Sequence, residues 1–332
     1  MNIAVVVTPE NTVPPKDYGG AERVAHVMVT QLMKRGHTVD LYCAPGSKCK
    51  ATNRISTPQF GMKYEPALVH MLYKNGVEQY DCIIDYAALH IASQQGWKNT
   101  FGLVGGDPYC KYPHDAVPNR VYVSKEFAGF NGCPDHPILR NPVCNTPSMV
   151  PLGKGDGGYV LYVGVLSAYK DLMDAAVACR LLRISLHVYG PIKDSHIPRM
   201  DYIMRESSFA GKEYVVYNHR LGQAGRQEVF GKALAFVHPI QVIDADPLSP
   251  KEAMLCGTPV VACPLGGIRS TIEEGVNGYY AWTQEGFKNQ ILKAMKLDRK
   301  LVRASIMKQI SPSTYGRDVE ATCERVARGE TW

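Results

Sequence analysis

The sequence lacks the cysteine pairs and basic tracts that would assign it to several common classes of protein. Its ten cysteines include no Cys-x-x-Cys pair, and Cys82, Cys179 and Cys263 lie in apolar segments that we expect to be core. Scattered buried thiols are typical of a reducing compartment and argue against a zinc site or a disulfide framework. The 37 basic and 31 acidic residues give a formal charge of +6 without a basic run, so we expect no nucleic-acid partner.

Long apolar stretches are also missing. No run approaches the roughly 20 residues that a membrane-spanning helix requires. The chain opens with the strand-like run MNIAVVVT and shows neither the charged region nor the long apolar region of a signal peptide. We therefore expect a soluble, cytoplasmic protein with no transmembrane segment, and we leave peripheral contact with a membrane open. The oligomeric state is not predicted by any feature of the sequence.

Several catalytic signatures do not occur. The chain has no Gly-x-Ser-x-Gly elbow and no Gly-x-x-x-x-Gly-Lys-Ser/Thr loop, so a serine hydrolase and a P-loop enzyme are unsupported. Its histidines show no i, i+4 pair and no neighbouring cysteine cluster, and we predict no metal site. No Gly-x-Gly-x-x-Gly follows the first strand, which disfavours a Rossmann-type NAD oxidoreductase but leaves it as an alternative.

What the chain does contain is an alternation of short apolar strands with helical patterns, repeated twice. The first series begins with a strand in NIAVVVT and a helix through AERVAHVMVTQLMKRG, and the second begins at GGYVLYVGV. This alternation is typical of parallel sheets with crossover helices, and 332 residues are enough for two cores. We predict two Rossmann-like α/β domains, residues 1–150 and 151–310, a linker near Asn145 to Gly158 and a terminal helix in 311–332.

The most informative stretch runs from His238 to Tyr280 and places two acids eight positions apart. An apolar run ending at His238 predicts a buried strand, a loop with two prolines follows, and KEAMLCG predicts a helix. Asp244 then lies at the carboxyl end of a strand and Glu252 in the next helix. Ligands of open parallel sheets bind at that edge, where helix N-termini present amides to anions. Two carboxylates there suit two diols, one on a sugar and one on a ribose.

This stretch resembles the signature of retaining GT-B glycosyltransferases, glycosyltransferase family four, also called glycosyl transferases group one. The residues that carry the resemblance are PIQ and, after the loop, EAM-x-CGTPVVA. It implies two doubly wound domains facing a central cleft, with the acceptor on the side of residues 1–150 and the donor on the side of 151–310. It also implies that the terminal helix crosses back to the N-terminal domain.

The resemblance assigns roles to individual positions in the second half. Asp244 takes the place of a glutamate that holds a donor-sugar hydroxyl near the reacting carbon, and Glu252 takes that of a glutamate on the ribose hydroxyls. Lys170 matches a lysine that neutralises the diphosphate, so Lys170 and Asp244 are the predicted catalytic residues. Further donor-binding positions are expected in the loop before the helix and after an earlier strand, namely Pro247, Leu248, Ser249, Asn218 and Leu221.

The first half contributes a glycine pair at the start of its first helix. Glycine lets backbone amides and the helix dipole approach a phosphate closely, and GG-x-E is similar to the family's opening motif. We therefore predict that Gly19 and Gly20 face the donor diphosphate. Glu22 is as well explained by a first-turn charge that favours the helix dipole.

Other positions depart from the family pattern. Val165 stands where an arginine usually pairs with the diphosphate, and Ser270 replaces a common glutamate. Gly105 and Gly106 stand where a His-Gly pair usually lies near the sugar, with His114 as a nearby loop histidine. These changes keep the nucleotide end of the site and alter its reacting end.

The resulting prediction is a transferase of a hexose from GDP-mannose or a UDP-hexose to a glycan or glycoconjugate hydroxyl, with retention. No cofactor is required by this reaction beyond the donor substrate, although the lost arginine leaves room for assistance by a divalent ion. The alternatives are a catalytically weak or inactive nucleotide-sugar binding protein and the NAD oxidoreductase named above.

Overall fold

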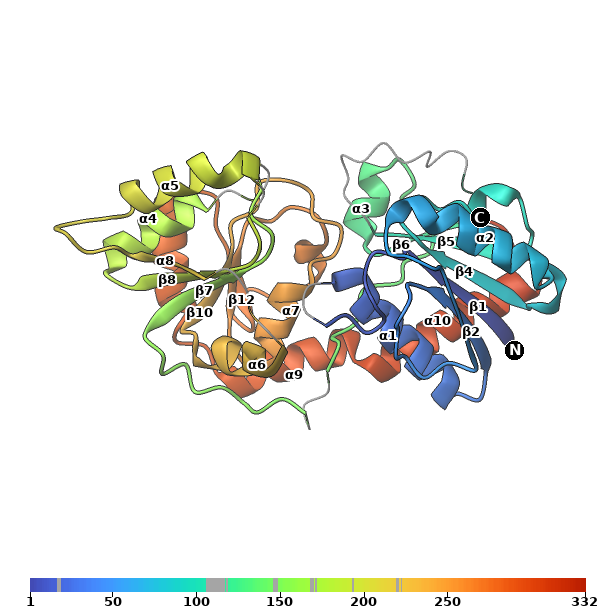
Figure 1. Cartoon of the computed structure of the whole chain (residues 1–332). Coiled ribbons are helices and arrows are strands. Elements are labelled where there is room, and N and C mark those ends of the chain that lie inside the picture. The colour runs from blue at the N-terminus through green and yellow to red at the C-terminus, as the bar shows by residue number, and fades with distance from the viewer. Residues whose placement is uncertain are drawn as a thin grey trace. The chain divides into compact units, whose positions relative to one another are not determined.

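The computed structural model describes residues 1–16, 19–105, 117, 119–145, 149–167, 170, 172–192, 194–218, 221 and 223–332, without the side chains of 194, 223 and 224. Gly106 and His114 lie outside the described residues. The chain divides into two compact units, of which the first comprises Met1–Cys144 with Ile310–Trp332 and the second comprises Asn145–Gln309 (Figure 1).

The first unit contains a parallel sheet in the order β3-β2-β1-β4-β5-β6. Its central strands form because runs of Val, Ile and other apolar residues suit a sheet that is covered on both faces. Its strands are β1 (Asn2–Val7), β2 (Thr38–Cys43), β3 (Asn53–Ser56), β4 (Cys82–Tyr86), β5 (Thr100–Val104) and β6 (Arg120–Tyr122). Its helices are α1 (Gly20–Lys34), α2 (Glu65–Lys74), α3 (Lys125–Phe130) and α10 (Pro312–Ala327), with short 3-10 turns at Met62–Tyr64, Val77–Gln79 and Ser93–Gln95.

The second unit repeats this plan with the order β12-β11-β10-β7-β8-β9. Its strands are β7 (Tyr159–Val163), β8 (Ser185–Tyr189), β9 (Val215–Asn218), β10 (Ala235–His238), β11 (Val260–Ala262) and β12 (Gly278–Tyr280). Its helices are α4 (Met173–Leu182), α5 (Ile197–Glu206), α6 (Gln223–Lys232), α7 (Leu248–Leu255), α8 (Gln284–Ala294) and α9 (Arg299–Ile310), with 3-10 turns at Asp194–His196 and Gly267–Ser270. The prediction of two α/β units with doubly wound parallel sheets is confirmed.

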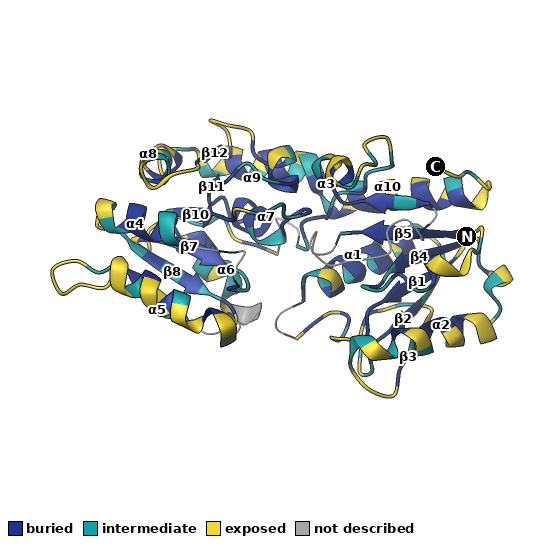
Figure 2. Cartoon of the chain, turned by 90° about the horizontal axis from the view of Figure 1, so that it is seen from above, coloured by how far each residue is buried: buried dark blue, intermediate teal, exposed yellow. Residues whose placement is uncertain are grey.

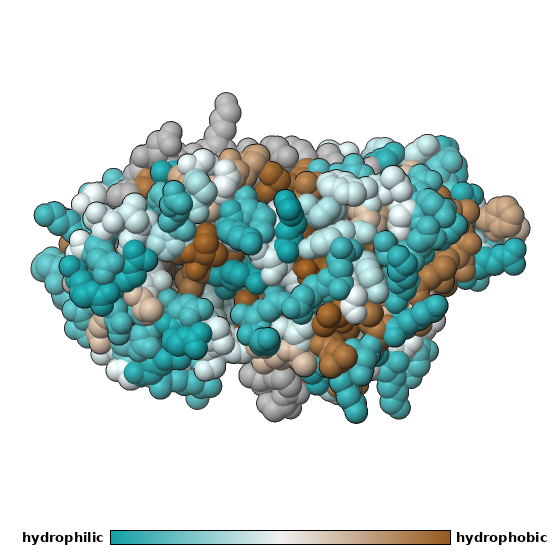
Figure 3. All heavy atoms as spheres, turned by 180° about the vertical axis from the view of Figure 1, so that it is seen from behind, coloured by the Kyte–Doolittle hydropathy of each residue, from teal (hydrophilic) through white to brown (hydrophobic). Residues whose placement is uncertain are grey.

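Burial follows the layers of each unit. Figure 2 shows the central strands in dark blue and helices such as α2 and α5 exposed on their outer sides. The polar exteriors agree with Figure 3, where hydrophilic side chains cover most of one face and apolar side chains gather in small groups. The predicted core cysteines Cys82, Cys179 and Cys263 are buried. Most of the apolar content therefore stabilises the two cores.

The last helix belongs to the first unit. It packs against α1 and β4, and Glu320 joins it to the end of α1. One Glu320 oxygen lies 2.8 Å from Arg35 Nη1 and the other 2.8 Å from His37 Nε2. The unit is thus completed by a segment that follows the second unit in the sequence.

Candidate functional site

The sheet of the second unit has its switch point between β7 and β10. These strands pair in parallel, with Ala235 beside Val160 and Phe236 beside Leu161. The chain builds outward from β7 through β8 and β9 on one side, and from β10 through β11 and β12 on the other. In open α/β sheets, the crevice at the carboxyl ends of such strands is where ligands bind.

Two of the predicted residues meet at this switch point. Lys170, in the loop after β7, places its Nζ 3.3 Å from Oδ2 of Asp244, in the loop after β10. The lysine side chain is 30% exposed and the aspartate side chain 21%. A partly exposed pair of this kind contributes about 1 kcal/mol or less, so a ligand can replace either partner at low cost.

The position of Asp244 depends on two glycines in the loop after β11. Its backbone pairs with Gly266 in an isolated bridge, and its carbonyl accepts a hydrogen bond from Gly267 N at 2.9 Å. A Cβ on Gly266 would lie 2.1 Å from the Asp244 carbonyl oxygen. Only glycine permits this approach, so the glycines of the GGIRS segment fix the loop that carries the predicted sugar-binding acid.

Glu252 lies on α7 and is already paired. Arg226, on α6, donates from Nε and Nη2 to the same Glu252 oxygen, at 3.0 and 2.5 Å. The guanidinium also lies 5.2 Å from the centroid of the Phe230 ring, a cation–π geometry. Arg226 therefore orients the Glu252 carboxylate, which the family resemblance predicts to bind the ribose. This partner was missed in the sequence because 26 residues separate it from the acid.

The start of α7 corrects one part of the predicted donor loop. Pro247 is the N-cap residue of this helix, and a proline has no backbone N–H to offer a ligand. Leu248 and Ser249, in the first helical turn, do carry amide groups that the helix itself leaves without partners. The prediction of backbone donors from Pro247 to Ser249 therefore reduces to Leu248 and Ser249.

A buried ion pair, which was also missed in the sequence, lies between the loop after β10 and helix α7. Asp246 Oδ2 and Lys251 Nζ are 2.5 Å apart, and both side chains are fully buried. Charges out of water must be paired, because an unpaired ion in the interior costs several kcal/mol. The pair joins the loop after β10, which carries Asp244, to helix α7, which carries Glu252. It therefore fixes the positions of these two predicted acids relative to each other.

In the second unit, the positions that depart from the family pattern lie in loops and at the ends of elements. Val165 is half-buried in the loop after β7 and brings no charge to it. Ser270 ends the 3-10 turn after β11, and Asn218 ends β9, where its side-chain amide donates to the Val216 carbonyl at 3.3 Å. Leu221 is half-buried after β9. The expected contact of Asn218 and Leu221 with a base stays a prediction.

In the first unit, the glycine pair opens α1 as expected. Gly19 is the N-cap residue and Gly20 the first helical residue. A Cβ on Gly19 would come within 2.7 Å of Glu22 Oε2 and 2.8 Å of Pro15 Cβ, so a side chain has no room there. The approach of a diphosphate to Gly19 and Gly20 stays a prediction.

Glu22 lies in the first turn of α1, where an acidic side chain favours the helix dipole. Its side chain is buried and accepts a hydrogen bond from Asn11 Nδ2 at 3.0 Å. Burial raises the pKa of its carboxyl above the usual value. The residue therefore anchors the loop between β1 and α1 from inside.

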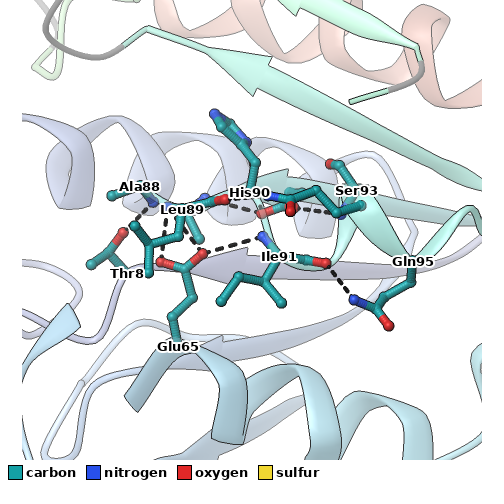
Figure 4. A network of polar contacts seen from close by, with 11 residues as sticks. Thr8, Glu65, Ala88, Leu89, His90, Ile91, Ser93 and Gln95 are labelled. Carbon is teal, nitrogen blue, oxygen red and sulfur yellow. Dashed lines mark hydrogen bonds and ion pairs between the residues drawn. The ribbon is translucent and has the colours of Figure 1, made fainter. Parts of the chain in front are cut away.

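The carboxyl end of β4 holds a network of buried acids (Figure 4). The Glu65 carboxylate accepts backbone hydrogen bonds from Leu89, at 3.1 Å to each oxygen, and from Ile91 at 3.4 Å. Burial raises the pKa of Glu65 to about 7. Asp85 accepts from the backbone of Ser93 at 2.7 Å, and its other oxygen lies 4.0 Å from His90 Nδ1. These acids shape the loop after β4 and have no family signature in the sequence.

Gly105 has a packing reason of its own. A Cβ at this position, directly after β5, would come within 2.7 Å of Val123 Cγ1. The glycine thus allows the end of β5 to lie close to Val123. This close contact explains the glycine without reference to a sugar.

Within the described ranges, no group of three or more His, Cys, Asp or Glu side chains is arranged to hold a metal ion. No helix formed by the described residues combines the length and the apolar character needed to cross a membrane.

Comparison with known proteins identifies the class of the second unit and the fold of the chain. Residues 157–296, most of the second unit, match the model of the family described as glycosyl transferases group 1. Sequence comparison with curated proteins finds no match. The second unit is therefore a group 1 glycosyltransferase domain, and the protein is a glycosyltransferase by class.

Solved structures share the fold over nearly the whole chain. AviGT4, a glycosyltransferase involved in avilamycin A biosynthesis, is 19% identical, with a TM-score of 0.81 over 100% of this chain and 99% of that one. Sucrose-phosphate synthase from Thermosynechococcus elongatus is 13% identical, with a TM-score of 0.78 over 99% and 100%. HepE of Anabaena, in complex with UDP and glucose, is 14% identical, with a TM-score of 0.71 over 97% and 99%. The chain thus has the GT-B fold of these enzymes.

Proposed function

We propose that the protein transfers a hexose from a nucleotide diphosphate sugar, GDP-mannose or a UDP-hexose, to a hydroxyl of a glycan or glycoconjugate, with retention at the anomeric carbon. The observation that carries the proposal is the ion pair between Lys170 and Asp244 at the switch point of the second sheet. A cation for phosphate and an acid for sugar hydroxyls are there brought together at the sheet edge that binds ligands.

Each charged side chain has one role in this proposal. Lys170 turns from Asp244 to the diphosphate and stabilises the negative charge that develops as it leaves, the kind of electrostatic stabilisation that dominates many enzymes. Asp244 then accepts hydrogen bonds from a hydroxyl of the hexose. Glu252, oriented by Arg226, accepts from the ribose. The amides of Leu248 and Ser249 donate to phosphate or sugar oxygens at the helix N-terminus.

The reaction needs no protein nucleophile. The bond from the anomeric carbon to the diphosphate oxygen breaks, and the acceptor oxygen forms its bond to the same face of that carbon. The acceptor proton passes to an oxygen of the departing phosphate. Lys170 lowers the barrier by stabilising that phosphate while the sugar carries positive charge.

The donor is supported by the proteins of similar fold. The structure of HepE holds UDP and glucose, and that of starch synthase IV from Arabidopsis thaliana, 13% identical with a TM-score of 0.70, holds ADP and acarbose. These ligands favour a nucleotide diphosphate hexose as the donor here. A glycan acceptor is consistent with the acarbose, a sugar-like ligand, in the latter structure.

Calorimetric titration with GDP-mannose, UDP-glucose, UDP-N-acetylglucosamine and NAD tests the proposal. We expect one sugar nucleotide to bind and to be hydrolysed slowly, and NMR of the released or transferred sugar to show the anomer of the donor. Binding of NAD alone would assign the chain to the oxidoreductases instead. An inverted product would overturn the retaining mechanism while leaving the transferase class in place.

A second candidate function is a nucleotide-sugar binding protein without turnover. It is favoured by Val165, because a site with Lys170 as the family lysine and no arginine at this position stabilises the leaving diphosphate less. A divalent ion could supply the missing charge. Turnover that survives exhaustive chelation would exclude that assistance, and binding with no turnover in the presence of Mg²⁺ or Mn²⁺ would favour the second candidate.

A further inference from the structure

His238 is a buried histidine at the end of the central strand β10, and among the described residues its ring makes no hydrogen bond. It is the last residue of β10, its backbone carbonyl accepts from Cys263 N at 3.1 Å, and its side chain is 6% exposed. Neither ring nitrogen has a hydrogen-bond partner among the described residues. A buried polar group without a partner costs about 1–3 kcal/mol, so an apolar side chain would be more stable here if the ring had no other use.

The ring points to the predicted sugar-binding acid. Nε2 of His238 lies 3.9 Å from Oδ2 of Asp244, the same oxygen that Lys170 contacts at 3.3 Å. A hydrogen bond from the ring requires about 3 Å, so the imidazole stands about 1 Å short of one. In this structure Lys170 therefore contacts the Asp244 carboxylate, and the His238 ring lies next to it without a hydrogen bond.

Donor binding would change this arrangement, because the Lys170 ammonium group cannot keep its present contact with Asp244 while it binds the diphosphate. We propose that His238 is a positioning residue, which donates a hydrogen bond from Nε2 to Asp244 when Lys170 turns to the leaving diphosphate. This inference rests on the proposed function. The neutral ring keeps the carboxylate in place and aimed at the sugar after its cation has left.

The electrostatics agree with a neutral donor. Burial lowers the pKa of His238 to about 4; Asp244 acts in the opposite direction, and Lys170 lowers the pKa further. The imidazole is therefore uncharged at neutral pH and can donate from one nitrogen only. A charged ring would place a second cation beside Lys170, which already balances the charge of Asp244.

Three variants of His238 separate this role from a packing role. The amide nitrogen of His238→Gln replaces Nε2, that of His238→Asn replaces Nδ1, and His238→Leu fills similar volume without a donor. We expect His238→Leu and His238→Asn to lower kcat about tenfold or more, with the affinity for the nucleoside diphosphate alone unchanged. His238→Gln should retain most of kcat. Equal kcat in the Leu, Asn and Gln variants would overturn the proposal.

A matched control is His187→Gln on β8. This histidine is half-buried in the same sheet and stacks on Tyr159 with ring centroids 4.2 Å apart. We expect its kcat and nucleotide affinity to equal those of the wild type. Urea unfolding of all four variants shows whether a lost kcat reflects a lost fold.

A measurement without donor keeps the inference separate from the proposed function. In Lys170→Met, the cation has left Asp244 permanently, so the His238 ring should carry its proton on Nε2 and form the hydrogen bond. Nitrogen-15 NMR of the ring, assigned by its absence in His238→Gln, reports the tautomer. A proton on Nδ1 would overturn the inference even if the transferase reaction is established. Failure of every sugar nucleotide to bind the wild type would instead overturn the proposed function.

Discussion

The two sheets have the same strand order, but the charged residues at their switch points differ in burial and in partners. At the end of β4 in the first unit, Glu65 and Asp85 are fully buried, and they accept backbone N–H groups of the loop that follows. At the ends of β7 and β10 in the second unit, Lys170 and Asp244 are partly exposed and contact each other. Buried acids that accept backbone N–H groups hold a loop in shape, whereas a partly exposed acid and cation that contact each other can exchange partners with a ligand.

The largest expected effect concerns the support of the second switch point. Lys251→Met leaves the buried Asp246 without its cation, and breaking a buried pair in this way costs about 3–5 kcal/mol. Urea unfolding should show this loss in the free energy of unfolding. The control is Lys232→Met, whose exposed pair with Glu228 should leave the unfolding midpoint unchanged. Equal midpoints for the two variants would mean that the buried pair does not stabilise the loop.

The two units should respond to pH with opposite signs. The pKa of Glu65 is raised to about 7 from 4.5, so its contribution to stability is complete below pH 4.5 and is lost as the pH rises through 7. The pKa of His238 is lowered to about 4 from 6.5, so its contribution is complete above pH 6.5 and is lost as the pH falls through 4. Each shift corresponds to roughly 3 kcal/mol at most.

Glu65→Gln and His238→Gln isolate these two contributions. Relative to the wild type, the first variant should gain stability as the pH rises from 4.5 to 7. The second should gain stability as the pH falls from 6.5 to 4. Urea unfolding of the three proteins across pH 4 to 7.5 measures both differences. If the stability of both variants relative to the wild type changed in the same direction as the pH rises, at least one of the two pKa shifts would be wrongly assigned to burial.

The third effect concerns catalysis. Lys170→Ala should lower kcat about a hundredfold, because removing a group that stabilises a developing negative charge commonly has that effect. The exposed Lys232→Ala is the control and should keep full activity. A steady-state assay of sugar transfer or donor hydrolysis measures both. An unchanged kcat in Lys170→Ala would remove this lysine from the diphosphate.

The contrast between the units also shows what the sequence can predict. The central strands were predicted because short continuous apolar runs such as AVVV in β1 are typical of buried strands. The edge strands β3 and β12 were not predicted, since NRIS is mostly exposed and GYY contains no run of apolar aliphatic residues. Short edge strands without an apolar run carry no clear signal in the sequence, so the pairing that creates them is visible only in three dimensions.

The site shows the same division. Asp244, Glu252 and Lys170 were found because the motif gives them fixed places along the chain, and the structure brings Lys170 and Asp244 together. Arg226 and His238 were not singled out, since their roles depend on partners reached across elements of the fold. A local spacing predicts which residue types line an edge. It does not predict which side chains hold them there.

The smallest effect tests the acid whose partner the sequence did not reveal. Glu252→Gln keeps a carbonyl oxygen for Arg226 but loses the negative charge that would accept the ribose hydroxyls, and a charged acceptor hydrogen bond is about twice as strong as a neutral one. Nucleotide affinity should therefore fall about tenfold by calorimetry, with kcat at saturating donor nearly unchanged. Glu228→Gln, an exposed acid on the neighbouring helix, should bind as the wild type does. If Glu252→Gln lowers kcat and leaves affinity intact, this acid acts on the reacting sugar, and the division between a nucleotide end and a reacting end at this sheet edge must be redrawn.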